Sequence, residues 1–380
     1  MINTLIISHS LIPSVLLCGH SQLEYLKSIN KVDYKFIEAD KVTRGLLSWA
    51  DIIIFLRSES KFESYISTIC KLAKKHMVYI LDDDLLNIPD YLSSSAYYRR
   101  KDIHNNMLRI MNNCDTFLTS SFVMLEKYGK QFKHAYQIDE PSLNVIDDKK
   151  DNERLKIGFA GSIDRAQDIN IILESCLEKV INNYSDTVDI EFMGAKPDIV
   201  DKYNLTYIPY QDSYEKYTKV IQDRNWDIGL APMPDSEFHS CKYYNKYVEY
   251  ASFGIAGIYS NLKPYTYGIK NEYNGLLTDN TSDDWYKSIS KLIEDSTLRK
   301  TIQNNCLNEA KTRYSLPVLA EDYLNKITDG LDISEPRKEV RGLWIYRIRT
   351  VLSQIKYKLK EQKLNFPIWA IKKIKELLSK

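Results

Sequence analysis

The sequence lacks the features that mark several common classes of protein. Its six cysteines are scattered, and none falls in a C-x-x-C or other metal-binding spacing, which excludes a structural zinc motif and favours a reducing compartment. It has no uninterrupted run of about 18 apolar residues, so no transmembrane helix is predicted. Its first residues, MINTLIISHS, carry neither a basic region nor a small-residue cleavage site, which indicates a first strand instead of a signal peptide.

The sequence also lacks a large excess of charge of one sign, since the net charge is only +1. The charges are unevenly placed, however. Residues 331–380 hold 13 lysines and arginines against 5 aspartates and glutamates, a net charge of +8, which leaves −7 for the first 330 residues. An acidic body with a basic tail is therefore predicted. The abundance of Lys, Asn, Ile and Tyr suggests an AT-rich, bacterial genome.

Apolar runs of strand length alternate with helical stretches along the chain. DIIIFL at 51–56 and the apolar part of MVYILDDD at 77–84 are typical of strands that are buried on both faces. The alternation predicts an α/β fold of parallel sheets with helices on both faces. With 380 residues and 44% hydrophobic content, the chain is long enough for two such domains. The charged segment 145–153 is the predicted linker between them.

Charged side chains follow three of the predicted strands in the first half. His9, Arg57 and the run Asp82, Asp83 and Asp84 each come directly after a strand. We expect them to lie near one edge of a parallel sheet, where the carboxyl ends of the strands meet and ligands bind. Two interpretations of the aspartates are a Mg²⁺ or Mn²⁺ site that also holds a diphosphate, and a strand-end turn with helix-capping carboxylates.

The second half opens with a predicted strand over 155–160, which Gly161 and Ser162 follow. A turn of small residues after the first strand of a Rossmann-like domain lets backbone N–H groups approach a phosphate. Arg165, just beyond the turn, is a candidate for a charged contact with the same phosphate.

The stretch 227–260 carries the strongest chemical signal. It predicts a strand, a polar loop, a helix over 240–253 and a second strand. Lys242, Lys246 and Glu249 are spaced at i, i+4 and i+7, which places them on one face of that helix. Near the positive end of the helix dipole, two lysines suit a diphosphate, and the carboxylate suits the hydroxyls of a sugar. A solvated face with an i,i+4 salt bridge is the alternative.

The same stretch resembles the donor-binding segment of the retaining GT-B glycosyltransferases, a family of nucleotide-sugar-dependent enzymes that build polysaccharides and glycoconjugates. The resemblance rests on DIGLAP, an acidic-aromatic loop and the pattern K-x3-K-x2-EY-A-x2-G, and it extends from about residue 155 to residue 327. Many members carry two glutamates separated by seven residues. Glu249 matches the second, whereas Cys241 occupies the position of the first. The chain is nearest to a branch with K-S-x2-K-x2-E, where Tyr243 stands in place of the serine.

The resemblance implies transfer of a hexosyl group from a nucleotide diphosphate sugar to a glycan, lipid-linked or protein-linked acceptor, with retention of configuration and without a metal or other cofactor. It implies two Rossmann-like domains that face each other across a cleft, an acceptor domain over 1–150 and a donor domain over 151–312, followed by a returning helix over 313–330. The implied donor-binding residues are Gly161, Ser162, Arg165, Tyr210, Lys242, Tyr243, Lys246 and Glu249. The candidate catalytic residues are His9 and Lys242, and the candidate acceptor-side residues are Arg57, Asp82, Asp83 and Asp84.

Two basic amphipathic helices are predicted in the tail, residues 331–380, one over 341–359 and one after Pro367. Such helices suit an anionic membrane surface or self-association, and docking on the acidic body is the alternative. We therefore expect a cytoplasmic enzyme of cell-envelope polysaccharide synthesis at the inner face of the membrane. Nucleic-acid binding is not expected, because no recognised module accompanies the basic stretch. The alternative function is a catalytically inactive GT-B-like partner of a transferase, since one glutamate of the motif is missing.

Overall fold

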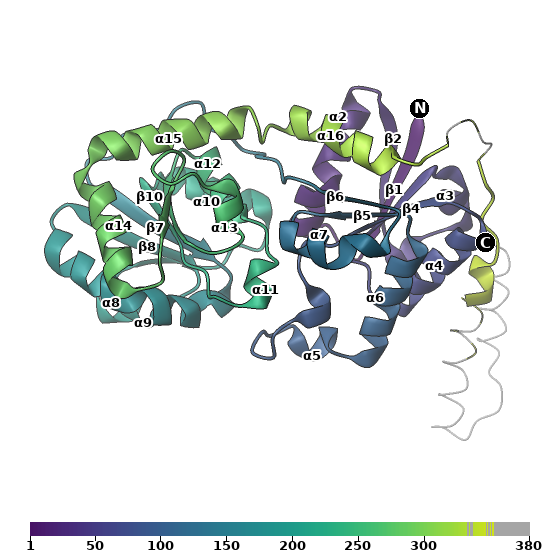
Figure 1. Ribbon diagram of the computed structural model, residues 1–380, viewed down its shortest axis with the longest axis horizontal. Coiled ribbons are helices and arrows are strands. Elements are labelled where there is room, and N and C mark those ends of the chain that lie inside the picture. Colours follow the sequence, from purple (N-terminus) through teal and green to yellow (C-terminus); the bar gives the residue numbers. More distant parts are fainter. Residues whose placement is uncertain (333, 335–336, 347, 349, 351, 353–380) are drawn as a thin grey trace, which may run out of the picture.

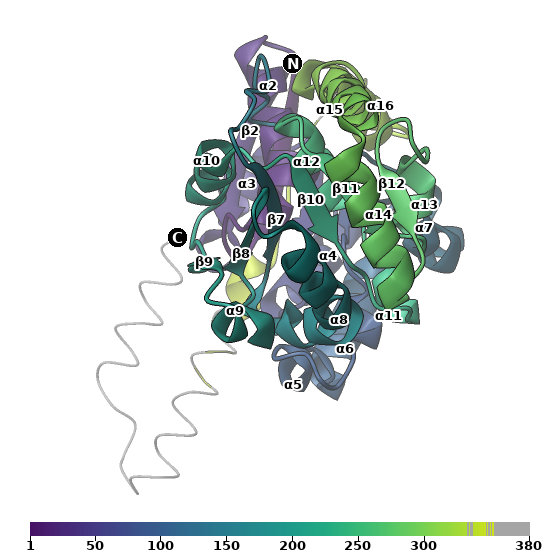
Figure 2. The ribbon, with the colours of Figure 1, turned by 90° about the vertical axis from the view of Figure 1, so that its left-hand side faces the viewer.

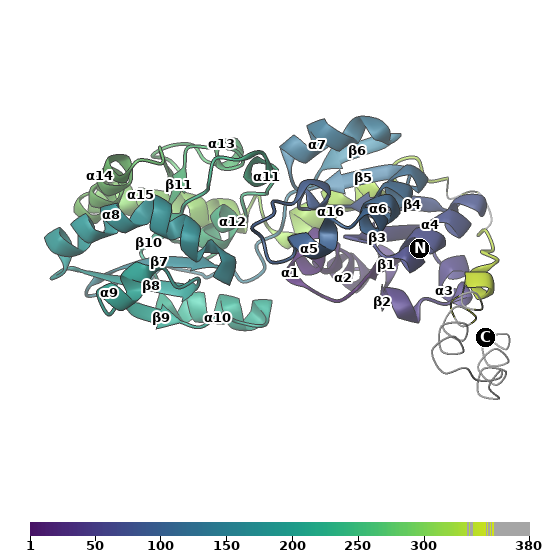
Figure 3. The same ribbon diagram turned by 90° about the horizontal axis from the view of Figure 1, so that it is seen from below.

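The computed structural model of the chain describes residues 1–332, 334, 337–346, 348, 350 and 352. Two six-stranded parallel sheets form the centres of two domains, one built from the first half of the chain and one from the second (Figure 1). The domains lie side by side along the long axis of the molecule, with helices on both faces of each sheet (Figures 1 and 3). The predicted alternation of strands and helices is confirmed.

The first sheet has the strand order β2-β1-β3-β4-β5-β6. Its strands are β1 Ile2–Ser8, β2 Val32–Glu38, β3 Ile52–Leu56, β4 His76–Ile80, β5 Thr116–Thr119 and β6 His134–Gln137. The helices of this half are α1 Pro13–Val15, α2 Ser21–Ser28, α3 Arg44–Trp49, α4 Lys61–Leu72, α5 Ser95–Tyr98, α6 Lys101–Asn113 and α7 Phe122–Tyr128. All five residues of β3 are buried, because helices α3, α4 and α6 cover one face of the sheet and α2 covers the other. Burial on both faces explains the unbroken apolar run IIIFL.

The second sheet has the strand order β9-β8-β7-β10-β11-β12. Its strands are β7 Leu155–Gly161, β8 Val188–Gly194, β9 Thr206–Ile208, β10 Ile228–Ala231, β11 Ala256–Ser260 and β12 Leu276–Thr278. Counted from β7, this is the order 3-2-1-4-5-6 of dinucleotide-binding Rossmann domains, in which the direction of winding switches between the first and fourth strands. The switch point of this sheet therefore lies between β7 and β10.

Helices on the second sheet fall into two groups on opposite sides of the strands (Figure 2). The helices of this half are α8 Ala166–Tyr184, α9 Asp198–Lys202, α10 Tyr214–Arg224, α11 Glu237–Ser240, α12 Asn245–Ser252, α13 Tyr265–Gly268, α14 Ser282–Glu294, α15 Ser296–Lys311 and α16 Leu316–Thr328. Helices α8, α9 and α14 pack on one face, and α10, α12 and α15 pack on the other. The second sheet is thus covered on both sides by its own helices.

Within its described residues, the chain passes between the two domains twice. Residues 138–154 lead from β6 to β7, and α15 continues into α16, which packs on α2 of the first domain (Figure 1). The two crossings touch, since the backbone N–H of Ser142 donates to the carbonyl oxygen of Tyr314 at 2.9 Å. Tyr323 and Ile327 of α16 are buried in the first domain. Helix α16, which follows the second sheet in the chain, therefore completes the core of the first domain.

The structure corrects the helix predicted over 240–253. Helix α11 ends before residues 241–244, which form a turn, and α12 begins after them. The hydroxyl groups of both tyrosines in this turn donate to Oδ1 of Asp139, each at 3.0 Å. These contacts with the segment between the domains hold the turn in a non-helical conformation. Lys242 lies in the turn, so it does not share a helical face with the lysine and glutamate of α12.

The described part of the tail packs on the first domain. Val340 and Leu343 are buried in its core. The ring of Tyr346 stacks on Phe62 of α4, with the ring centres 4.9 Å apart. For these residues the structure agrees with docking on the body, the alternative to a membrane-bound or self-associating tail.

The rest of the predicted tail lies outside the described residues. This holds for most of the helix expected over 341–359 and for all of the helix expected after Pro367. Among the described residues, no helix is both long enough and apolar enough to cross a bilayer.

Candidate functional site

A cavity of about 330 Å³ lies between the two domains, beyond the carboxyl ends of β7 and β10. This is the switch point of the second sheet, the position at which open α/β sheets bind ligands. Residues that follow β4 and β6 close the cavity from the first domain. The predicted site residues that line it are Asp82, Asp83, Gly161, Ser162, Arg165, Lys242, Tyr243, Lys246 and Glu249.

The turn after β7 requires small residues because its surroundings are crowded. A Cβ on Gly161 would lie 2.7 Å from the ring of Phe159. The adjacent β8 ends in Gly194, which has a φ of +79° and whose Cβ would lie 2.1 Å from the Gly161 carbonyl oxygen. Ser162 then leads through a short 3-10 helix into α8. The backbone of this turn borders the cavity without a bulky side chain, which is what close approach of a phosphate requires.

Arg165 is held between the loops that follow β7 and β10. Its Nε lies 3.0 Å from Oδ2 of Asp168, and its Nη2 donates to the carbonyl oxygen of Pro232 at 2.5 Å. Only 17% of the side chain is exposed. The guanidinium is therefore a fixed positive charge in the cavity wall, next to the glycine turn.

Lys246 and Glu249 lie on α12 and share a network with Tyr217 of α10. The Tyr217 hydroxyl donates to Oε2 of Glu249 at 2.7 Å, and Nζ of Lys246 lies 2.7 Å from the same hydroxyl oxygen. The lysine and the glutamate also form an ion pair. Because both charged side chains are largely buried, water screens this network less than it screens a surface salt bridge.

Lys242 reaches across the cavity to the first domain. Its Nζ lies 2.9 Å from Oδ1 of Asp83 and 4.8 Å from the centre of the Phe238 ring. Burial opposes ionisation of Asp83, but Lys242 and Arg57 together lower its pKa below the ordinary value. The lysine therefore faces a carboxylate, and an anionic ligand in the cavity would compete with that carboxylate for it.

The other two aspartates after β4 also have cationic partners. Nη1 of Arg57 donates to Oδ2 of Asp82 at 2.9 Å, so the arginine supports a residue of the cavity wall without lining the wall itself. Asp84 is 1% exposed, pairs with Lys127 at 2.8 Å and does not line the cavity. Its side chain makes no capping hydrogen bond to the turn that follows. Asp84 thus belongs to the packing of the first domain.

Two further predicted residues lie outside the cavity wall. Nε2 of His9 lies 2.8 Å from Oε1 of Glu59 and 3.4 Å from Oε2 of Glu63, so the imidazole faces these carboxylates. Tyr210 follows β9 and is 57% exposed. Tyr243 does line the cavity, but its hydroxyl donates a hydrogen bond to Asp139 in the segment between the domains.

Several polar residues of the wall were not predicted, among them Glu140, His239 and Asn245. Burial, and after it the negative charge of Asp82, raises the pKa of Glu140 to about 8. At neutral pH this carboxyl group is therefore mostly protonated and can donate a hydrogen bond. Burial and two neighbouring cations lower the pKa of His239 to about 4, which keeps its imidazole neutral. Oδ1 of Asn245 is buried and accepts no hydrogen bond from the described residues.

The two walls of the cavity differ in chemistry. Arg165, Lys242, Lys246 and the glycine turn bring positive charge and backbone N–H groups together on the second domain. Such a wall can neutralise a diphosphate, including the charge that develops when the diphosphate leaves. The first-domain wall carries carboxyl groups, which suit the hydroxyl groups of a sugar.

The fold is similar to those of solved glycosyltransferases. Anabaena HepE, in complex with UDP and glucose, matches with a TM-score of 0.57 and 12% identity, over 87% of this chain and 100% of that chain. A glycosyltransferase from Rickettsia africae matches with a TM-score of 0.59 and 12% identity, over 87% and 99%. TarM matches with a TM-score of 0.53 and 12% identity, over 80% and 57%.

The sequence itself matches no protein-family model and no curated protein. At 12% identity the structural similarity establishes the architecture of the chain and not its activity. The predicted fold class is confirmed for the described residues, which form two Rossmann-like parallel-sheet domains on either side of a ligand-sized cavity. The chain therefore has the GT-B fold.

Proposed function

We propose that the protein is a glycosyltransferase that moves a sugar from a nucleotide diphosphate sugar to a glycan, lipid-linked or protein-linked acceptor. The observation that carries this proposal is the convergence of Arg165, Lys242, Lys246 and the Gly161 turn at the switch point of the second sheet. A diphosphate suits such a wall because it offers several charged oxygens to fixed cations and backbone N–H groups. The UDP and UDP-glucose complexes of HepE, which has the same fold, support a nucleotide-sugar donor.

The proposed chemistry depends on charge neutralisation. When the glycosidic bond to the diphosphate breaks, negative charge develops on the leaving phosphate, and preorganised cations stabilise it without reorganisation. Arg165 is already fixed by its two contacts, and Lys242 and Lys246 supply two more positive charges. We propose that these groups replace a divalent ion at the diphosphate. We also propose that a hexosyl group is transferred with retention of configuration, because the K-x3-K-x2-E pattern resembles that of the retaining GT-B glycosyltransferases.

The remaining wall residues divide between the two substrates. We propose that Glu249, held by Lys246 and Tyr217, accepts the hydroxyls of the nucleotide ribose. The acceptor then approaches from the first domain, where Asp82 and the neutral Glu140 face the cavity. Arg57 acts only through its contact with the Asp82 carboxylate. His9 is assigned no part in the transfer step, because its imidazole faces carboxylates outside the cavity wall.

Nucleotide affinity tests this proposal. Isothermal titration of UDP, GDP, dTDP and CMP, each with Mg²⁺ and with EDTA, should identify one nucleotide that binds equally well under both conditions. Lys246→Met removes a charge-assisted contact that is worth about 1.5–3 kcal/mol, so we expect it to weaken binding roughly 10- to 100-fold. Glu249→Gln should weaken the binding of nucleotides that carry ribose more than it weakens the binding of pyrophosphate.

The matched control is Lys219→Met. Lys219 forms an exposed ion pair with Asp223 on α10, outside the cavity wall, so its loss should leave nucleotide affinity unchanged. Equal loss in both lysine variants, or no binding of any nucleotide, would contradict the proposal. Tight nucleotide binding without release of sugar from the matching nucleotide sugar, with or without candidate acceptors, would favour the catalytically inactive partner instead.

A further inference from the structure

The first sheet has a switch point of its own. Its order β2-β1-β3-β4-β5-β6 places β2 on one side of β1 and β3 on the other, so the direction of winding changes between β1 and β3. The same order occurs in flavodoxin-like sheets, whose ligands bind at this crevice. The residues that follow β1 and β3 in this chain are polar, and one of them, His9, was singled out by the sequence but takes no part in the proposed transfer.

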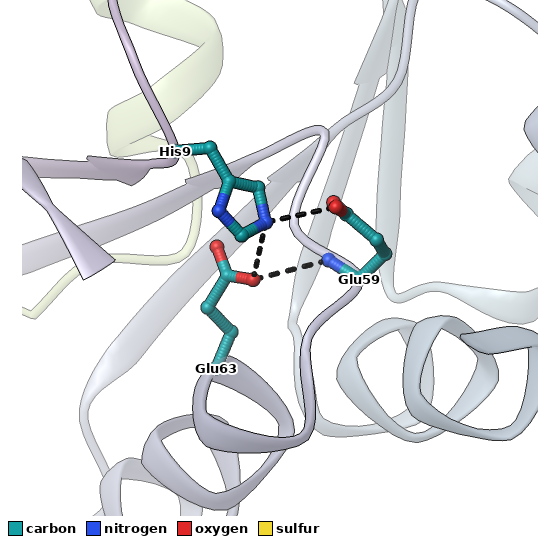
Figure 4. Close-up of side chains that lie close together, drawn as sticks. All are labelled: His9, Glu59 and Glu63. Atoms are coloured by element: carbon teal, nitrogen blue, oxygen red, sulfur yellow. Dashed lines mark hydrogen bonds and ion pairs between the residues drawn. The ribbon is translucent and has the colours of Figure 1, made fainter. Parts of the chain in front are cut away.

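His9, Glu59 and Glu63 form a compact cluster at this switch point (Figure 4). Each offers one ligand atom, and the three atoms lie within 4.8 Å of one another. Nε2 of His9 is 2.8 Å from Oε1 of Glu59 and 3.4 Å from Oε2 of Glu63. Ligands about 2.1 Å from a divalent ion lie about 3 to 3.5 Å apart. The His9–Glu63 pair, at 3.4 Å, already has this separation, and the His9–Glu59 pair, at 2.8 Å, is slightly shorter.

The two carboxyl groups are buried and incompletely satisfied. Glu59 is 4% exposed and Glu63 is fully buried. Oε2 of Glu59 and Oε1 of Glu63 accept no hydrogen bond from any described residue. Figure 4 shows both carboxyl groups turned toward the imidazole of His9, one from α4 and one from the segment before it. Buried carboxylate oxygens without a partner are costly, and metal coordination is one of the few ways to satisfy them.

The surroundings hold the carboxylates in place. Oε2 of Glu63 accepts hydrogen bonds from the backbone N–H groups of Ser60, at 2.9 Å, and Glu59, at 3.2 Å. The Tyr97 hydroxyl donates to Oε1 of Glu59 at 3.3 Å. Such contacts orient the two carboxylates before a metal arrives. The His9 side chain is 50% exposed, so an ion has a route in from solvent.

We propose that His9, Glu59 and Glu63 bind one divalent transition-metal ion, such as Zn²⁺ or Mn²⁺. Three protein ligands of this kind leave further coordination positions for water or a substrate hydroxyl. The imidazole ligand favours Zn²⁺ or Mn²⁺ over Mg²⁺, which prefers an all-oxygen octahedron. A divalent ion also brings two positive charges to two buried carboxylates, which balances their charge.

This site is separate from the proposed diphosphate site and does not rest on the proposed function. It belongs to the first domain and uses residues outside the cavity wall. The bound ion would connect the loop after β1 to the segment between β3 and α4. Through Glu59 it would also fix Tyr97 in the helix-rich region that follows β4.

Metal content and affinity test the site directly. The full-length protein is stripped with EDTA, dialysed and titrated with Zn²⁺ or with Mn²⁺ alone, and the metal retained after gel filtration is counted. We expect one equivalent of Zn²⁺ per chain. His9→Gln removes a direct ligand, so the affinity for Zn²⁺ should fall at least about 100-fold. Loss of a residue that only hydrogen-bonds to a ligand causes a smaller decrease. Glu63→Gln, which keeps the shape of the side chain, should have a similar effect.

The matched control is His104→Gln. His104 lies on α6, away from the cluster, and its Nε2 has no hydrogen-bond partner among the described residues. The six cysteines are all buried, so they do not offer competing sites in the folded protein. Failure to retain Zn²⁺ or Mn²⁺, or equal affinity in the wild type and both histidine variants, would overturn the proposal. Nucleotide binding by the stripped protein, measured in parallel, reports on the diphosphate site independently.

Discussion

At the scale of the residue, Glu140 is the least expected group in the cavity wall. It follows β6 on the segment that crosses between the domains, and it is 2% exposed. Its Oε1 accepts a weak hydrogen bond from the Cys18 thiol at 3.5 Å. Burial, with the charges of Asp82 and Asp83 after it, makes the ionised form unfavourable and raises the pKa to about 8. A neutral carboxyl group therefore faces the proposed acceptor at physiological pH.

This raised pKa predicts a pH dependence of stability. Below the ordinary pKa of 4.5 the carboxyl group is protonated in both the folded and the unfolded chain, so its full contribution to the free energy of unfolding is present. Between 4.5 and about 8 only the unfolded chain loses the proton, and the free energy of unfolding falls as the pH rises, by up to about 1.4 kcal/mol per pH unit. Urea unfolding of the wild type and of Glu140→Gln at pH 5 to 8 measures this contribution. The variant should become relatively more stable toward pH 8, and parallel curves for the two proteins would refute the assignment.

Features of single residues such as this one could not be recognised from the sequence. Glu140 stands in no motif, and its altered pKa results from aspartates that reach it only in the folded chain. His9 and Glu59 are separated by 50 positions in the sequence, so their contact depends on the neighbouring positions of β1 and β3. The Lys242, Lys246 and Glu249 pattern was recognisable because all three residues lie within one short segment.

At the scale of the element, α4 shows how local sequence fixes the residues of the metal cluster. The Oγ of its N-cap residue, Ser60, accepts a hydrogen bond from the backbone N–H of Glu63 at 3.1 Å, and the Glu63 carboxylate accepts one from the Ser60 backbone N–H. This reciprocal pair is a capping box, which satisfies two of the free N–H groups at the start of the helix. One glutamate thus both caps the helix and faces His9.

Ser60→Ala should destabilise the protein by about 1 kcal/mol, because the free N–H of Glu63 loses its partner. Urea unfolding followed by circular dichroism measures the change. Ser94→Ala is the control, since Ser94 is also an N-cap residue, at α5, but its side chain makes no capping hydrogen bond. The control should change stability by less than about 0.5 kcal/mol. Equal effects in the two variants would mean that the capping box contributes nothing measurable.

The elements themselves were predictable to different degrees. Strands such as β3 were clear from the sequence because burial on both faces leaves a continuous apolar run. The helix over 240–253 was predicted as one piece, since its apolar spacing and lysine pattern are helical throughout. The break at 241–244 arises from tyrosine hydroxyls that bind Asp139, a residue about 100 positions earlier, and such tertiary contacts override local propensity.

At the scale of the whole molecule, polar contacts connect the two domains around the cavity. Lys242 of the second domain pairs with Asp83 of the first, and Lys127 of α7 pairs with Glu237 of α11, 2.6 Å apart. Figure 3 shows α7 and α11 next to each other across the gap between the domains. These contacts are ion pairs and hydrogen bonds. An anionic ligand can therefore replace one of their anionic partners without exposing much apolar surface.

Asp83 is the contact in which this exchange is most direct. If the diphosphate binds at Lys242, it must displace the Asp83 carboxylate, and both anions repel each other while they share the lysine. Both side chains are about a quarter exposed, so the energy of the pair lies between that of a surface and that of a buried salt bridge. Removal of the Asp83 charge should therefore favour the nucleotide, whereas removal of the Lys242 charge should disfavour it.

We accordingly expect Asp83→Asn to bind the nucleotide identified by titration more tightly than the wild type, by about 1 kcal/mol or roughly fivefold. Lys242→Met should bind it more weakly, and the difference between the two variants should shrink at high salt, which screens the charges. Asp102→Asn is the control, because Asp102 forms an exposed pair with Arg100 in the same domain but outside the cavity. Unchanged or weaker nucleotide binding by Asp83→Asn would show that Lys242 does not contact the diphosphate. The contact would then serve only to hold the two domains together, and the proposed site would rest on Arg165 and Lys246 alone.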